Sequence, residues 1–140
     1  MKQAENNFSL DRVLKQRTHY DELREIFNHH NDETAKEFGL ATLNMLTGEL
    51  DAAMKHIRFV FDRRPDDPLI HTRVAEIFVM GGDYKSAAGH LEEARRLDPD
   101  DFTVFLLLAA CYNRMRDKDK INKSKEYIEA YYNFIKLLVT

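Results

Sequence analysis

The residues best suited to chemistry in this 140-residue chain are six histidines and a single cysteine. His29 and His30 stand beside Asp32 and Glu33, and imidazole together with carboxylate suits zinc or a similar ion. Adjacent residues on a helix, however, point about 100° apart. The chain also has no His-Glu-x-x-His or Cys-x-x-Cys motif. We therefore expect these side chains to be solvated, with no metal and no cofactor bound.

The remaining reactive groups give no positive sign of catalysis. Cys111 directly follows the apolar run 106–110, which indicates a buried structural thiol rather than a nucleophile. His56 and His90 lie 34 residues apart, as two solvated or partly packed side chains of a repeat would. Opposite charges three or four residues apart, most simply a solvated helix face, occur among Glu92, Glu93, Arg95 and Arg96. We expect the protein not to be an enzyme.

Composition narrows the class of partner. The net charge of −3 comes without a Lys/Arg stripe, which argues against nucleic-acid binding. No run approaches the roughly 18 apolar residues that a membrane span needs, so we expect no membrane insertion. Residues 1–8 are polar and unlike a signal peptide, and the lone cysteine excludes an intramolecular disulfide. These features predict one cytoplasmic domain.

The elements that would position these residues are helices. Apolar residues recur three and four apart without sustained alternation of period two, and this pattern predicts an all-α fold. Pro68 at a first turn and Asp83 as an N-cap mark helix starts. The predicted helices cover residues 8–14, 18–29, 34–46, 50–63, 68–80, 84–97 and 102–115. Residue 32 or 34 would cap the third of these helices. The last helix would begin at residue 120 or 122 and end at residue 138.

Two segments of the chain match at an offset of 34 residues. Gly48, Leu50, Ala53, Ile57 and Pro65 are echoed by Gly82, Tyr84, Ala87, Leu91 and Pro99. A helix–turn–helix unit of this length must stack on its neighbours to bury its apolar face. We expect repeats at 34–67 and 68–101, a degenerate helical pair at 1–33, and an incomplete repeat with a capping helix at 102–140. Because Arg116 replaces the turn glycine, we expect the last helix to be shifted or modified.

These positions resemble the tetratricopeptide repeat family. The match is clearest at His71, Val74, Ala75 and Phe78, followed by Ala87, Leu91, Ala94 and Pro99, and again at Phe105, Leu108, Ala109 and Tyr112. Glu37 and Asn44 depart from the family pattern. The resemblance implies a right-handed solenoid of antiparallel helix pairs, with about three repeats and a C-terminal capping helix.

In this family the first helix of each repeat lines a concave groove. The resemblance therefore implies a non-catalytic adaptor that holds a peptide or an amphipathic helix of a protein partner. The groove residues would be Phe38, Thr42, Met45, Leu46, Leu69, Thr72, Arg73, Glu76, Val79, Met80, Leu106, Ala110, Asn113 and Arg114. The same apolar stripe could instead be core. Some members of the family bind the C-terminal carboxylate of chaperones through a clamp of polar and basic side chains. Phe38 and Thr42 occupy clamp positions here, which argues against that function. A small secretion-type chaperone is an alternative.

The C-terminal helix has an unusually wide apolar arc made of two rows. One row is Tyr127, Tyr131, Phe134 and Leu138, and the other is Ile128, Tyr132, Ile135 and Val139. The helix could cap the solenoid, fill the groove, or pair with a second copy. We favour capping by one row and predict an oligomer surface at Tyr127, Tyr131, Phe134 and Leu138. The alternative function is a self-assembling scaffold, with a homodimer as its simplest form.

Overall fold

The computed structural model describes residues 19–140, and every regular element in that range is a helix. Residues 19–28 are helical. They are followed by α2 (Glu33–Leu46), α3 (Leu50–Arg63), α4 (Pro68–Met80), α5 (Tyr84–Leu97), α6 (Thr103–Met115) and α7 (Lys118–Val139). The all-α prediction is confirmed, and the helix predicted at 8–14 lies outside the described residues.

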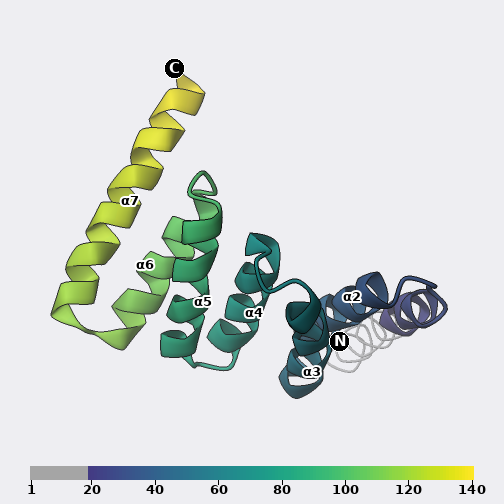
Figure 1. Ribbon diagram of the computed structural model, residues 1–140. Helices are drawn as coiled ribbons and strands as arrows, with labels where there is room; N and C mark the ends of the chain where they lie inside the picture. Colours follow the sequence, from purple (N-terminus) through teal and green to yellow (C-terminus); the bar gives the residue numbers. More distant parts are fainter. Residues whose placement is uncertain (1–18) are drawn as a thin grey trace, which may run out of the picture.

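Each helix packs chiefly against its neighbours in the sequence. In Figure 1, α4 to α7 stand side by side as a row, and α2 and α3 continue from the α4 end of that row. Residues 19–28 lie at one extremity of the molecule, and the end of α7 lies at the other. Contacts between helices are therefore local in sequence.

Aspartates begin most of these helices. Asp32, Asp67, Asp83 and Asp117 are N-caps whose carboxylates accept hydrogen bonds from backbone N–H groups of the first turn. Such a cap satisfies donors that have no partner within the helix. The caps predicted from the sequence at residues 32 and 83 are confirmed, and Pro68 starts α4 as expected.

The turns between paired helices share one backbone geometry. Gly48, Gly82 and Arg116 have φ angles of 79°, 83° and 53°, all in the left-handed region. The helices that follow, α3, α5 and α7, each begin two residues later, so their starts are also spaced 34 residues apart. Of the two expected changes to the last helix, the shift is wrong, but the helix is modified in length: α7 has 22 residues, against 14 in α3 and in α5. Arg116 adopts the conformation that glycine has in the other two turns, at a cost of about 1 kcal/mol.

The interior consists of two apolar clusters that meet at α4. The first lies among α2, α3 and α4 and contains Ala41, Met45, Ala53, Ile57, Val60, Ile70, Val74 and Ile77. The second lies among α4 to α7 and contains Ala75, Ala87, Ala88, Leu91, Ala94, Val104, Leu108, Cys111, Tyr112 and Tyr127. Phe78 packs against both clusters. The small residues Ala41, Ala75 and Ala109 are all buried, which lets adjacent helices approach closely.

Candidate functional site

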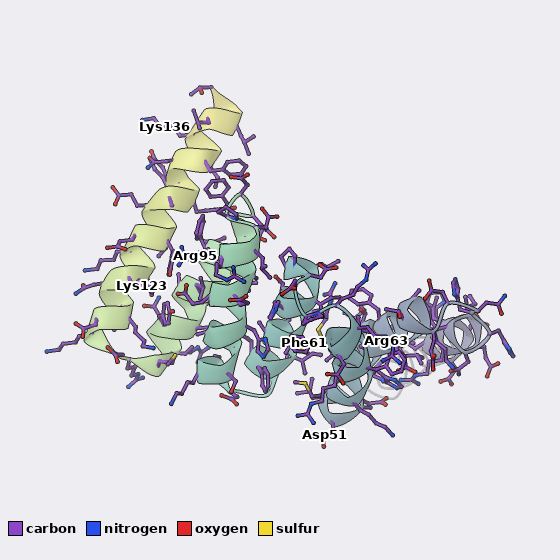
Figure 2. The ribbon with its side chains drawn as sticks, in the orientation of Figure 1. Asp51, Phe61, Arg63, Arg95, Lys123 and Lys136 are labelled. Carbon is purple, nitrogen blue, oxygen red and sulfur yellow. The ribbon has the colours of Figure 1, made fainter. Side chains whose placement is uncertain are left out.

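A cleft of about 450 Å³ opens where α2, α3 and α4 meet. Its apolar wall is formed by Phe38, Val60, Leu69 and Ile70. The charged residues that line it are Asp32, Arg63, Arg64 and Asp67. Arg63 lies on the side of α3 that faces α2 (Figure 2). The cleft thus combines an apolar floor with a charged rim, an arrangement typical of sites that orient a bound group.

The charged groups at this rim differ in the hydrogen bonds that they already make. The carboxylates of Asp32 and Asp67 accept hydrogen bonds from the backbone N–H groups of Ala35 and Leu69, both at 3.0 Å. Arg64 is 63% exposed and makes a single 3.4 Å contact to Asp67. Arg63 donates a hydrogen bond to the backbone carbonyl of Phe59 at 3.1 Å and stacks on its ring. Because the aspartates already cap helices, Arg64 is the charged group most available to a ligand. The rim therefore favours an acidic group over a basic one.

A second cleft, of about 350 Å³, lies between residues 19–28 and α2. Its lining is almost wholly apolar and consists of Leu23, Phe27, Ala35, Phe38, Gly39, Thr42, Leu43 and Leu46. A Cβ at Gly39 would lie 2.4 Å from the ring of Phe27, so glycine is what lets this ring approach α2 closely. Ala35 and Phe38 line both clefts, which places the two openings side by side on α2.

Arg73 of α4 packs against the shared wall. Its guanidinium lies 5.6 Å from the centre of the Phe38 ring, and it forms an ion pair with Glu76 at 2.6 Å. The buried Nε of Arg73 has no hydrogen-bond partner among residues 19–140. Because the Arg73 side chain is only 23% exposed, its first role in the fold is to join α4 to α2.

Apart from Arg73 and Met45, the predicted groove residues separate into three groups. Phe38, Thr42, Leu46 and Leu69 line the clefts. Leu106, Ala110, Asn113 and Arg114 of α6 are exposed but belong to neither cleft, and Thr72, Glu76, Val79 and Met80 lie on α4 outside them. For Met45 the predicted place in the groove is wrong. It is only 7% exposed and belongs to the first apolar cluster, because its side of α2 packs against α3 rather than facing a ligand.

The sequence did not predict most of the residues that line the two clefts. Val60, Arg63 and Arg64 come from the second helix of a repeat, and Leu23 and Phe27 come from the irregular N-terminal part. The repeat pattern assigns ligand contacts to first helices only, so it could not select these residues. The one signal in the sequence is the Arg63-Arg64 pair before Pro65.

A half-buried carboxylate joins α5, α6 and α7. Glu92 accepts hydrogen bonds from the hydroxyl groups of Tyr112 at 2.5 Å and Tyr127 at 2.6 Å, and from Arg95 at 2.9 Å. Lys123 approaches to 3.4 Å, and Figure 2 locates Arg95 on α5 and Lys123 on α7. The expected solvated face is therefore only partly correct: α6 and α7 leave 25% of the Glu92 side chain exposed, whereas Arg95 keeps 39%.

The pKa values of Glu92, Tyr112 and Tyr127 indicate a structural contact rather than a proton donor. Burial alone would raise the pKa of Glu92, but hydrogen bonds from Tyr112, Tyr127 and Arg95, with Lys123 nearby, lower it to about 2. Burial and the bond to Glu92 raise the pKa of both tyrosines. A carboxylate that stays ionised at neutral pH, beside phenols that stay protonated, has no pKa near the operating pH of a general acid or base.

The predicted oligomer row faces the body of the protein. Tyr127 is 6% exposed and its ring stacks on Phe105, and Phe134 stacks on Phe102 with the ring centres 4.3 Å apart. Tyr131 is half-buried, and only Leu138, at 68%, is largely exposed. For Tyr127 and Phe134 the predicted oligomer surface is therefore wrong, because these rings cover α6.

Equivalent histidines occupy equivalent places in the two regular repeats. His56 pairs with Glu37, and His90 lies 3.1 Å from the Nδ1 of His71. The Nε2–H of His71 donates to the carbonyl of Pro65 at 2.6 Å, so its Nδ1 is free to accept from His90. Burial, followed by repulsion from His71, lowers the pKa of His90. These are contacts between neighbouring helices, not a ligand set.

The remaining histidines and the cysteine do not come together in one site. His29 lies 3.3 Å from Glu25, and the Nδ1 of His30 accepts from the backbone of Asp32. Within residues 19–140, no three His, Cys, Asp or Glu side chains are placed to hold a metal ion. Cys111 is a free, buried thiol whose pKa is raised by burial. In the same range no helix has the length and apolar character needed to cross a bilayer.

Comparison with known proteins yields no matching family model and no similar curated sequence.

Proposed function

We propose that this protein is a non-catalytic polypeptide-binding module. In this proposal, three helix pairs of tetratricopeptide type form a right-handed solenoid, and the two clefts beside α2 hold an apolar segment of a partner protein. The recurring left-handed turns at residues 48, 82 and 116 support the repeat arrangement. So do the buried alanines at positions 41, 75 and 109. The single cysteine is consistent with a reducing compartment. A cytoplasmic location is therefore part of the proposal.

The observation that carries the proposal is the pair of adjoining clefts. Phe38 and Ala35 line both, and their apolar walls follow α2 over much of its 14 residues, a length of about 21 Å. Leu46 and Leu69 remain 62% and 54% exposed at these clefts. Large apolar side chains that stay exposed in a rimmed hollow are typical of an interaction site. Two hollows in line suit an extended or helical segment with two apolar anchors.

The rim adds a chemical preference. An acidic residue next to the anchor in the first cleft would lie near Arg63 and Arg64, and its charge would be complementary to theirs. We therefore expect partner segments in which two apolar residues are accompanied by an acidic one.

A peptide-display selection on the full chain tests this proposal. Enriched peptides are then measured by fluorescence anisotropy against wild type, Leu46→Glu and Leu69→Glu. We expect selected peptides to be apolar with acidic neighbours, and each substitution to weaken binding at least about tenfold, or roughly 1.4 kcal/mol. Arg64→Glu should weaken only the peptides that contain an acidic residue.

Leu137→Glu is the matched control, because Leu137 is a 78% exposed leucine on α7, remote from both clefts. Circular dichroism verifies that each variant is folded. Failure of the library to enrich any peptide, or equal weakening by the Leu137 control, would refute the proposed site.

A further inference from the structure

The second apolar row of α7 is open to solvent. Ile128, Tyr132 and Val139 are 47%, 62% and 78% exposed, and Ile135 is half-buried. The neighbouring row that contains Tyr127 and Phe134 already covers α6. This row is thus a separate flank of the same helix, and three of its four side chains are largely open to solvent.

α7 is also much longer than the helix it covers. It has 22 residues and spans about 33 Å, whereas α6 has 13 residues and spans about 20 Å. The stack of Phe134 on Phe102, just before the start of α6, marks the point where this support ends. In Figure 1 the last turns of α7 project beyond the row of helices. This extension presents apolar side chains that the fold of one chain does not use.

The spacing of the exposed row is that of a helix-pairing seam. Ile128, Tyr132, Ile135 and Val139 follow one another at intervals of four, three and four residues, the a/d pattern along which two helices pack. Lys125 continues the same line toward the start of α7 and is exposed, so a charge ends the apolar row there. The seam is therefore short: it begins at Ile128, before the Phe134 stack, and continues to Val139 in the projecting part of the helix.

This seam is complementary to itself when two copies run antiparallel. Ile128 then meets Val139 of the second copy, and Tyr132 meets Ile135 of the second copy, so each residue of the row has a partner. Glu129 and Lys136 flank the row on one side, seven residues apart. In the antiparallel pair, each of these carboxylates lies beside the Lys136 ammonium of the other copy. Flanking charges of this kind set orientation in paired helices.

Both flanking charges are available for such a contact. Glu129 and Lys136 are exposed, and within the described residues neither belongs to an ion pair. Figure 2 shows Lys136 projecting from the far part of α7, away from the other helices. A parallel pair would instead place like residues at the same level and leave these charges without opposite partners.

We propose that a second copy of this chain binds the row formed by Ile128, Tyr132, Ile135 and Val139, giving an antiparallel dimer with two-fold symmetry. The contact is self-complementary, as such symmetry requires. It involves four layers of side chains, which places it among small interfaces that associate weakly. The dimer does not depend on the clefts beside α2, and it leaves them open.

Sedimentation velocity on the full chain, from about 1 to about 500 µM, tests this proposal in the range of weak dimers. We expect a monomer–dimer equilibrium within that range. Ile128→Glu and Tyr132→Glu should weaken it at least about tenfold. Leu137→Glu is the matched control, since this leucine is 78% exposed on the opposite side of α7, and it should leave the equilibrium unchanged.

A charge exchange tests the antiparallel orientation. Glu129→Lys and Lys136→Glu each place like charges opposite one another in a self-pair, so each variant should dimerise more weakly than wild type. Mixing the two variants restores both opposite-charge contacts, so the mixture should form a one-to-one dimer. A wild-type monomer throughout the concentration range, or a dimer insensitive to Ile128→Glu and Tyr132→Glu, would overturn the proposal. A mixture no stronger than its parts would overturn the antiparallel arrangement.

Discussion

At the scale of single residues, Glu92 connects the last three helices. Its carboxylate belongs to α5, whereas the two phenol groups that bind it come from α6 and α7. The rings of Tyr112 and Tyr127 also stack on each other, with centres 6.2 Å apart. Hydrogen bonds to a charged group are stronger than those between neutral groups, and a buried charge is destabilising without them. The ionised Glu92 therefore helps to hold α7 against α5 and α6.

We predict that Glu92 makes the fold sensitive to acid. Its pKa is about 2 in the folded chain, against an ordinary value of 4.5. The folded state therefore binds the proton less readily than the unfolded state, and the stabilisation is complete above about pH 4.5 and lost as the pH falls toward 2. Glu92→Gln should lower the free energy of unfolding by about 2 kcal/mol at pH 7, and by less at pH 3. Urea unfolding at several pH values measures both effects.

Glu93→Gln provides the control for this prediction. Glu93 follows Glu92 directly but pairs with Arg96 at the surface, where ion pairs contribute little. Its replacement should therefore lower stability by less than that of Glu92. A Glu92→Gln variant with the same acid sensitivity as wild type would show that the network does not stabilise the fold.

Residue-scale contacts were the part of the site least accessible from the sequence. Glu92 and Tyr127 are 35 residues apart, so no local pattern connects them, and Glu92 looked like one member of an exposed charged series. Met45 has the spacing of a groove residue, but the rotation of α2 against α3 buries it. Phe38, Thr42, Leu46 and Leu69, which the family resemblance assigned to the groove, line the two clefts, and their contact with a partner stays a prediction.

At the scale of elements, the left-handed turn before α7 is the point of strain. Arg116 has a φ of 53°, a conformation that is unfavourable for any residue with a Cβ. We predict that Arg116→Gly raises the free energy of unfolding by about 0.5–1 kcal/mol, since glycine adopts this conformation without the steric penalty. Thermal or urea unfolding measures the gain.

The reverse substitution in the preceding turn serves as its counterpart. Gly82 has a φ of 83°, and a Cβ built there meets no atom within 4 Å. Gly82→Ala should therefore lower stability by about 1 kcal/mol through backbone conformation alone. If Arg116→Gly destabilises the protein instead, contacts of the Arg116 side chain must outweigh the strain.

Elements were predicted more reliably than contacts, because their ends are marked by single residues. The predicted helices 50–63, 68–80 and 84–97 coincide with α3, α4 and α5. Proline, glycine and capping aspartate delimit these helices. The start of α7 was placed two to four residues late, because Arg116 gives no sequence signal of a left-handed turn. Its function as a turn residue is imposed by the packing of α7 on α6, which only the three-dimensional arrangement contains.

At the scale of the whole molecule, the contacts between helices follow the order of the helices in the chain. Each helix packs chiefly on its neighbours in the sequence, and the two apolar clusters meet only around α4. In a solenoid of the kind proposed above, stability is approximately a sum of local terms and neighbour interfaces. A defect in one cluster should then loosen the helices around it more than those at the other end.

Val60 and Val104 give a matched test of this organisation, since both are 1% exposed and belong to different clusters. Either valine replaced by alanine removes two methyl groups, a loss of about 1.6 kcal/mol before any cavity effect. Hydrogen exchange read by mass spectrometry should show Val60→Ala reducing protection mainly in α2 and α3, and Val104→Ala mainly in α5, α6 and α7. Equal loss of protection throughout the chain in both variants would instead mean that the helices unfold as one cooperative unit. In that case α4 transmits the defect, and the two clusters act as a single core.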